Sequence, residues 1–470
     1  MESYSFLLLS LILLICTHFL VNLKRWVFVK RKLPPGPTGL PILGNIIAIG
    51  QRPHESLANM AKKHGPLMTV QLGYNTTVVA SSIEMAKEFL QKNDQACLGR
   101  PVPDAITAQH DYEVAMAWIS GGPRWRKLRK LCNSQVFTTQ RLDALQELRN
   151  QMYRAMVERL RKQVKRGGRV YWEEIKELVA RIMFLGGKPN ISDYFPFLKP
   201  FDLQHLKRDI EVSYHRLHSL LDNIIDQRQK RRESKLPRCD DFLDVLLDNY
   251  QFSPEELSLA EIKTMLTDLF IGGTDTSSTT IEWVMTELLR HPKVMDKLKQ
   301  ELADTISLGQ SIEEKDIPRL PYLQAVLKES LRLHPAAPLL LPHQAQMDVQ
   351  VCGYTIPKGT HLVVNSWCIS RDPVNWPDRP TEFIPERFLD SKLDFRGTNL
   401  CFTPFGSGRR ICPGLSLSVR MLSLSLGNLV HHFDWKLPDG MAPEDIDIGD
   451  KFGITLQKAI PLVAIPTLVN

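Results

Sequence analysis

Apolar and polar residues repeat along most of this chain with the period of a helix. Helical, heavily charged periodicity runs from Trp125 to Arg166, and the pattern predicts one long helix from about Leu257 to Arg290. A further helix is expected from Tyr322 to Leu333, where Pro335 stops it. The segment Gly414 to Phe433 reads as a buried helix. The chain is therefore predicted to be mainly helical.

Strand-like patterns are few and short. They occupy Leu67 to Leu72, Thr76 to Ala80 and the alternating stretch from Val349 to Asn365. No internal repeat or low-complexity segment is present, so a single large domain is favoured over a repeat array. The predicted fold class is mainly α (α+β), with a small β-rich subdomain.

The N-terminus has the composition of a membrane anchor. Phe6 to Leu23 contains no Asp, Glu, Lys or Arg, and about 18 apolar residues are enough to span the hydrocarbon core. A cleaved signal peptide is the alternative, but Lys24, Arg25 and Trp26 follow where small residues would stand at a cleavage site. Because the basic flank lies after the helix, the positive-inside rule leaves the rest of the protein in the cytosol.

Three segments are thus expected. Residues 1–23 form the anchor, residues 24–44 form a basic and Pro/Gly-rich hinge, and residues 45–470 form the globular domain. The hinge contains Pro34-Pro35-Gly36-Pro37, which cannot continue a helix and stiffens the chain into extended segments. The expected topology is a single pass through a membrane, with the globular domain in the cytosol.

Composition narrows the function classes. With 470 residues and 43% hydrophobic content the chain can bury a large core. A formal charge of +7, from 59 basic and 52 acidic residues, argues against nucleic-acid binding and suits a basic face for an acidic protein partner. The eight cysteines include no CxxC pair, which indicates reduced thiols in a cytosolic environment.

One cysteine stands in a special setting. The run from Pro404 to Gly414 is a glycine-punctuated loop that delivers Cys412 to the beginning of an apolar helix. Unpaired backbone N–H groups and the helix dipole at that end favour a thiolate, and a soft thiolate is a good iron ligand. The alternative is a buried structural cysteine near a turn.

The spacing of the residues in this loop favours an iron ligand over a structural cysteine. Phe405, Gly408, Arg410, Cys412 and Gly414 match the haem-binding signature of the cytochromes P450, and the chain resembles that family over nearly its whole length. The resemblance implies the P450 fold, haem as cofactor and Cys412 as the axial thiolate ligand of its iron.

Other segments of the resemblance occur in the expected order. Glu329 and Arg332 lie three apart on one helix face, and Arg387 follows in a segment that resembles the one completing a buried triad with this pair. Taken alone, such a pair is weak evidence for a functional role, because most Glu–Arg pairs of this spacing are surface salt bridges. The resemblance implies that the three residues support the haem loop and do not touch substrate.

The long central helix carries two adjacent glycines, Gly272 and Gly273, and each costs about 1 kcal/mol relative to Ala. Close helix packing, with hydroxyls bonded back to carbonyls, is one explanation. The segment also resembles the family's oxygen-activation motif, which includes Asp275 and Thr276. That resemblance implies close approach of the helix to the haem and a short proton relay through the acid and the alcohol.

The two haem propionates need donors, and arginine suits carboxylates. Trp125 and Arg129 lie four apart and resemble the family's Trp-x-x-x-Arg propionate clamp; Arg410 and His343 are the further candidates.

No flavin or nicotinamide fingerprint is apparent. The resemblance therefore implies that electrons come from NADPH through the membrane-bound cytochrome P450 reductase.

The substrate is expected to be small and lipophilic. Segments aligned with the family's substrate-contacting regions are largely apolar: Val102 to Trp118, Leu269 to Gly273, Ala336 to Leu341 and Phe452 to Leu456. The chain resembles plant microsomal enzymes of the geraniol 8-hydroxylase type, which implies hydroxylation of a terpenoid such as a monoterpenol with dioxygen. A phenylpropanoid or flavonoid hydroxylase is the alternative substrate class.

The chain departs from the family at one point. After Gly167-Gly168-Arg169-Val170 it runs at once into Trp172 to Met183, which resembles the helix opening the substrate lid. The family ordinarily has a further bundle helix between these points, and its absence would expose apolar surface. A catalytically silent or misfolded variant therefore remains an alternative, as does a haem-thiolate isomerase or dehydratase, against which the retained Asp275 and Thr276 argue.

Overall fold

The computed structural model describes residues 33–469 apart from 167–173, 254, 256 and 308. Its regular structure is mostly helical, as the periodicity predicts. The helices are α2 (Ile46–Ile49), α3 (Pro53–His64), α4 (Ile83–Lys87), α5 (Pro123–Leu131), α6 (Thr139–Ala144), α7 (Gln146–Arg166), α8 (Glu174–Gly187), α9 (Ile191–Tyr194), α10 (Leu206–Glu233), α11 (Phe242–Phe252), α12 (Leu259–Arg290), α13 (Pro292–Thr305), α14 (Pro321–Leu333), α15 (Ser366–Ile369) and α16 (Leu415–His432).

Strands form one four-stranded sheet and three two-stranded ones. The strands are β1 (Leu67–Leu72), β2 (Asn75–Ala80), β3 (His343–Gln344), β4 (Val349–Val351), β5 (Tyr354–Ile356), β6 (His361–Val364), β7 (Phe433–Lys436), β8 (Asp450–Lys451), β9 (Gln457–Lys458) and β10 (Ile465–Leu468). In the larger sheet the order is β1-β2-β6-β3, with β2 and β6 parallel and the other pairs antiparallel. The small β-rich part expected from the sequence is therefore present.

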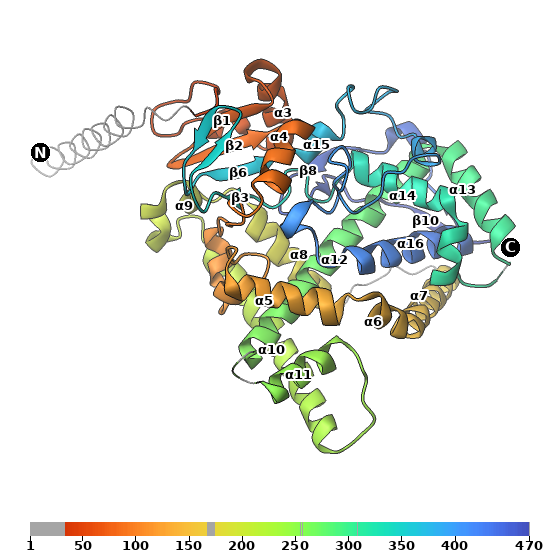
Figure 1. Cartoon of the computed structure of the whole chain (residues 1–470). Helices are drawn as coiled ribbons and strands as arrows, with labels where there is room; N and C mark the ends of the chain where they lie inside the picture. The colour runs from red at the N-terminus through yellow and green to blue at the C-terminus, as the bar shows by residue number, and fades with distance from the viewer. Residues whose placement is uncertain (1–32, 167–173, 254, 256, 308, 470) are drawn as a thin grey trace, which may run out of the picture.

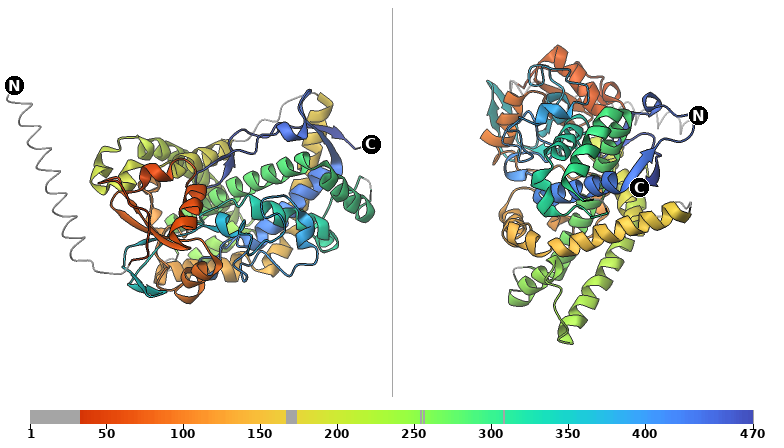
Figure 2. Two further views of the ribbon diagram at one scale, coloured as in Figure 1. Left: turned by 90° about the horizontal axis from the view of Figure 1, so that it is seen from above. Right: turned by 90° about the vertical axis from the view of Figure 1, so that its right-hand side faces the viewer.

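The sheet and the helical body lie at opposite sides of the molecule. β1, β2 and β6 gather with α3 and α4 at one side, whereas α13, α14 and α16 gather at the other (Figure 1). α10 and α11 project from the body, as the right-hand view of Figure 2 shows. The helix α12 passes between these parts and connects them.

α12 contributes to two apolar cores. Its first half packs with α10 and α11 through Ile262 and Met265, and its second half packs with α13, α14 and α16 through Val284 and Leu288. The helix begins with a capping box, in which the side chain of Ser258 accepts the N–H of Glu261 and the Glu261 carboxylate accepts the N–H of Ser258. A long, well-capped helix buried at both ends is a rigid platform for the residues in its middle.

The residues Glu329, Arg332 and Arg387 meet in an ion-pair cluster in which Glu329 and Arg332 are fully buried and Arg387 is partly buried. Arg332 donates to both Glu329 carboxylate oxygens at 2.7 and 2.8 Å, and Arg387 Nε donates to one of them at 2.9 Å. The remaining Arg332 donors bond to the carbonyls of Ser370 and Pro380. Because every charged group has partners, the cluster ties α14 to the loop before the Cys412 segment without leaving an isolated buried charge.

The start of the described chain is docked on the sheet. The Pro35 carbonyl accepts the N–H of Thr69 in β1 at 2.8 Å, and Gly36 lies so close to Thr69 that a Cβ there would be 1.8 Å from its carbonyl oxygen. The predicted anchor at residues 1–23 and the basic part of the predicted hinge lie outside the described residues. Among the described residues, no helix is long and apolar enough to cross a membrane.

The junction where the sequence departs from the family falls between α7 and α8. α7 ends at Arg166 and α8 begins at Glu174, which leaves only seven residues between them, outside the described part. α8 packs on α10 and α12, so it covers the first apolar core. α7 exposes Leu148 (51%) and Met152 (58%), which lie one turn apart. An uncovered apolar strip on α7 agrees with the surface expected from a missing neighbour.

Candidate active site

The loop that carries Cys412 is built from tight glycine turns. Gly406 and Gly408 have positive φ angles of 77° and 67°, and a Cβ on Gly408 would lie 1.9 Å from the Leu90 carbonyl oxygen. Only glycine fits this combination of backbone angle and close approach. The N–H of Cys412 then donates to the Phe405 carbonyl at 2.9 Å, which closes the loop directly before α16.

The electrostatics of Cys412 differ from the sequence expectation. Burial raises the pKa of its thiol, and the backbone N–H groups of Gly414 and Leu415 and the charge of Arg129 lower it, with a net increase. The end of α16 therefore stabilises a thiolate as predicted, but burial outweighs this effect in the protein alone. A metal ion bound to the sulfur compensates the negative charge of a buried thiolate and so favours loss of the thiol proton.

The middle of α12 offers space beside its backbone. Gly272 and Gly273 are exposed, and a Cβ added to either would meet no heavy atom within 4 Å. The hydroxyl of Thr276 donates to the Gly272 carbonyl at 2.5 Å. The backbone at Gly272 and Gly273 thus lies beside open space, and the Thr276 hydroxyl bonds to the helix next to it.

Asp275 points elsewhere. Its carboxylate is buried, and it accepts hydrogen bonds from the hydroxyl of Thr455 and from the Gln457 amide at 3.1 Å. Consecutive side chains on a helix diverge by about 100°, so the acid and the alcohol of the predicted relay leave α12 in different directions. The structure therefore places Asp275 against the β8–β9 hairpin and Thr276 beside the open space.

The predicted propionate ligands gather in a cationic cluster. Arg410 lies over the Trp125 ring, 4.5 Å from its centre, and donates to the carbonyls of Leu98 and Ile119 at 2.7 and 2.5 Å. The ring Nδ1 of His343 donates a hydrogen bond to the Cys97 carbonyl at 2.8 Å. Trp125, Arg410 and His343, which lie far apart in the sequence, therefore border the same loop.

The cluster also contains Arg100, which sequence reasoning missed. Arg100 is buried and donates to the carbonyls of Leu341 and Pro342 at 2.5 and 2.7 Å, directly before His343. A single arginine between Gly99 and Pro101 carries no pattern that would mark it. The signal lies in its buried, charged side chain, which only the fold reveals.

No carboxylate offsets these charges among the described residues. Arg100 and Arg410 donate to backbone carbonyls, and their Nε atoms are buried without a partner. Arg129 has neither a hydrogen bond nor an ion pair with the described residues. Burial and the neighbouring Arg410 charge lower the pKa of Arg100 to about 9, and burial and the Arg129 charge lower that of Arg410 to about 10. Uncompensated buried cations fit a ligand with two carboxylates, which haem has.

Apolar side chains from three of the predicted substrate-contacting regions meet on one core. Met116 and Trp118, Phe270 and Ile271, and Ile454 are partly buried and pack on the cluster formed by α8, α10 and the first half of α12. Gly187 on α8 permits this, because a Cβ there would lie 2.4 Å from the backbone N of Ile454. We refer to these five side chains as the apolar lining, because they come from three of the predicted substrate-contacting regions and pack on one core.

Comparison with known proteins gives a family match over most of the chain. The cytochrome P450 family model matches residues 34–185 and 171–463. The chain is 44% identical to geraniol 8-hydroxylase of Swertia mussotii over 467 residues, with 93% of this chain and 94% of the relative covered. It is also 44% identical to geraniol 8-hydroxylase of Catharanthus roseus over 466 residues, covering 93% and 94%. Ferruginol synthase of Isodon rubescens is 39% identical over 491 residues, covering 98% of each chain.

These alignments locate the departure from the family. Since 93% of 470 residues is about 437, about 30 of the 467 positions aligned with the Swertia enzyme have no residue in this chain. The two family matches also meet, with overlap, at 171–185, beside the junction of α7 and α8. Both findings agree with a missing segment at this junction. The family match and the identity over more than nine tenths of the chain nevertheless establish that this protein belongs to the cytochrome P450 family of haem-thiolate monooxygenases.

Proposed function

We propose that this protein hydroxylates a small terpenoid alcohol, with geraniol or a related monoterpenol as the substrate. The observation that carries the proposal is the pairing of the Cys412 loop with a cationic cluster that has no carboxylate among the described residues, beside the apolar lining that includes Met116. Relatives named for geraniol and ferruginol support a terpenoid substrate. A phenylpropanoid or flavonoid substrate has no comparable support.

Each group then has a role in the reaction. Haem bound through Cys412 supplies the activation of dioxygen. Arg100, Arg129 and Arg410, with His343, bind its carboxylates and fix its orientation. Gly272 and Gly273 keep the side of α12 open, and the apolar lining orients the substrate and excludes water.

Proton delivery is assigned to Thr276 and Asp275. The Thr276 hydroxyl donates to the Gly272 carbonyl and so keeps its oxygen lone pairs available as acceptors beside the open space. The Asp275 carboxylate is the acid one residue away, held by Thr455 and Gln457. The pair holds and moves protons between the protein interior and the open side of α12.

The protein has no flavin or nicotinamide fingerprint in its sequence, and the family works with a redox partner. We therefore propose NADPH-cytochrome P450 reductase as the electron donor, which docks on the basic protein through its own acidic surface.

Residue Arg129 is expected to hold haem through its charge. Replacing it in the variant Arg129→Leu removes one charge-assisted hydrogen bond, of about 1.5–3 kcal/mol, and should weaken haem retention roughly tenfold or more. The measurement is the ratio of Soret to protein absorbance after extensive washing. Arg126→Leu on the same helix, at an exposed position, is the control and should retain haem. An equal loss of haem in both variants would show that Arg129 does not bind haem.

Turnover tests the substrate. The full chain, expressed in microsomes with reductase and NADPH, is expected to convert geraniol into a singly hydroxylated product that contains one oxygen atom from dioxygen. Isotope-labelled dioxygen and mass spectrometry detect that atom. Product from a phenylpropanoid or flavonoid but from no terpenoid would contradict the proposed substrate class.

We propose a membrane location because the N-terminal segment is apolar and because two groups of apolar side chains are exposed. Leu40 and Ile47 are exposed on either side of Leu43 in the sequence, and the Leu43 carbonyl accepts the N–H of Gly73. Phe197 and Phe201 are exposed after Tyr194, whose carbonyl accepts the N–H of Tyr74. Protease added to sealed microsomes should digest the globular domain, as expected for a single-pass protein of the endoplasmic reticulum facing the cytosol. A protected globular domain would contradict this orientation.

A further inference from the structure

The β8–β9 hairpin reaches from the edge of the molecule to the middle of α12. β8 and β9 pair antiparallel, with Asp450 opposite Lys458 and Lys451 opposite Gln457. Residues 452–456 form the tip between them. The hairpin contacts α12 at its tip and α3 at its base, so it connects two elements that lie far apart in the sequence.

At the tip, the hairpin holds both oxygens of the Asp275 carboxylate. The Thr455 hydroxyl donates to Oδ2, and the Gln457 amide donates to Oδ1 at 3.1 Å. Thr455 is 3% exposed and Asp275 is 7% exposed, so water competes little for these bonds. The direction of the carboxylate is therefore set by residues 180 positions away in the sequence.

The backbone that follows Thr455 is itself fixed by two hydrogen bonds. The next residue, Leu456, donates its N–H to the Ala336 carbonyl at 2.9 Å and accepts the Trp283 indole N–H on its own carbonyl at 2.9 Å. The Lys458 ammonium lies 4.8 Å from the centre of the Trp283 ring. A donor on such a fixed backbone can orient a carboxylate and does not merely follow it.

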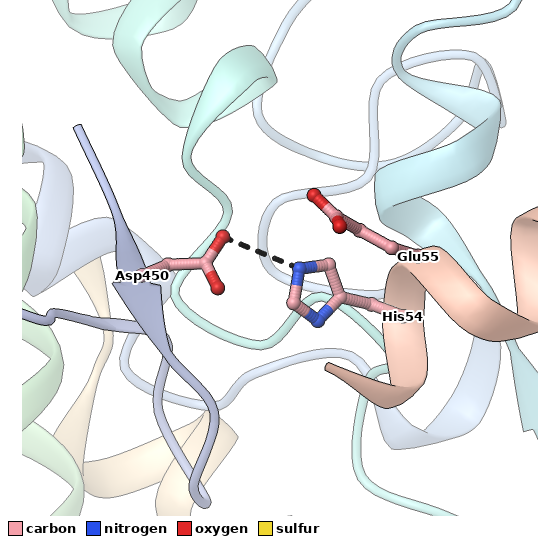
Figure 3. Close-up of side chains that lie close together, drawn as sticks. All are labelled: His54, Glu55 and Asp450. Atoms are coloured by element: carbon pink, nitrogen blue, oxygen red, sulfur yellow. Dashed lines mark ion pairs between the residues drawn. The ribbon is translucent and has the colours of Figure 1, made fainter. Parts of the chain in front are cut away.

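The base of the hairpin is anchored by charge (Figure 3). Asp450 accepts two hydrogen bonds from Arg52 at 3.0 and 2.8 Å, and its carboxylate lies 3.3 Å from Nε2 of the buried His54. Burial raises the pKa of Asp450, but the contacts with His54 and Arg52 outweigh it and lower the pKa to about 2. Asp450 is therefore ionised at all physiological pH values and binds α3 throughout.

His54, Glu55 and Asp450 are also residue types that bind metal ions, and their ligand atoms lie within 4.8 Å of one another. However, one Arg52 nitrogen lies 2.8 Å from a carboxylate oxygen of both Glu55 and Asp450. The guanidinium group supplies the positive charge at this place. We therefore interpret the cluster as the anchor of the hairpin and not as a metal site.

We propose that Thr455 and Gln457 are positioning residues for Asp275, and that Asp450 fixes the hairpin that presents them. This inference rests on the proposed role of Asp275 in proton delivery. The hairpin tip carries Ile454, which packs in the apolar lining, so one short segment contacts both the substrate side and the acid. The hairpin donors hold Asp275 and thereby determine how much of the reducing power ends in product and how much in released hydrogen peroxide.

A double-mutant cycle tests the contact without reference to activity. Thr455→Val keeps the shape of the side chain and removes its hydroxyl. We expect it to lower the unfolding temperature of the haem-containing full chain by about 2 °C or more, and to have less than half this effect in the Asp275→Ala background. Equal effects in both backgrounds would overturn the inference, because Thr455 would then act independently of Asp275.

Product partition tests the role. With geraniol, reductase and NADPH, Thr455→Val should lower the ratio of product to hydrogen peroxide several-fold while the spectrum of the carbon monoxide complex stays unchanged. Thr455→Ser, which restores the hydroxyl, should restore the ratio. Thr467→Val is the control, since its hydroxyl bonds to the Asp434 carbonyl outside the site. An unchanged ratio in Thr455→Val would overturn the positioning role, whereas a wild-type protein without turnover would refute the proposed function and leave the unfolding cycle to decide the contact.

Discussion

The structure depends on buried positive charge that the described protein residues do not neutralise. Arg100 and Arg410 are surrounded by backbone carbonyls, Arg129 has no charged partner in the described structure, and burial lowers the pKa values of all three. Burying one such ion without an opposite charge costs several kcal/mol. Haem has two carboxylates, and we propose that they offset these arginine charges and so complete the electrostatics of the domain.

The same reasoning applies to the sulfur of Cys412. Backbone N–H groups at the start of α16 favour a thiolate, but burial outweighs them and raises the pKa of the thiol. Iron bound to the sulfur reverses that balance. In the proposed site the cofactor would be held by two complementary charges, one at the thiolate and one at the propionates, and Arg129 would contribute to both because its charge also acts on Cys412.

Much of this arrangement could be predicted from local sequence. The spacing from Phe405 to Gly414 identifies the ligand loop, and the periodicity gives α12 and α14 within two residues of their observed bounds. The orientation of Asp275 could not be predicted, because its partners Thr455 and Gln457 come from a hairpin far along the chain. Arg100 was missed for a similar reason: its importance arises from burial beside Arg410, which no local pattern encodes.

The shortened connection between α7 and α8 is the feature that most challenges an active enzyme. Leu148 and Met152 on α7 are exposed, and about 30 positions aligned with the Swertia relative have no residue in this chain. The residues proposed to bind haem lie on α5, at the start of β3, in the loop after Gly99 and in the loop before α16, none of which is at this junction. The central claim is that this chain still binds haem through Cys412.

The most direct test is the carbon monoxide difference spectrum of the dithionite-reduced full chain in microsomes. A strongly red-shifted Soret band is expected for the wild-type protein and for Cys368→Ser, whose thiol is a free one outside the loop, and it should be absent in Cys412→Ser. If wild-type protein is present and folded but shows no such band, the chain does not hold haem through a thiolate and the catalytic assignment is wrong.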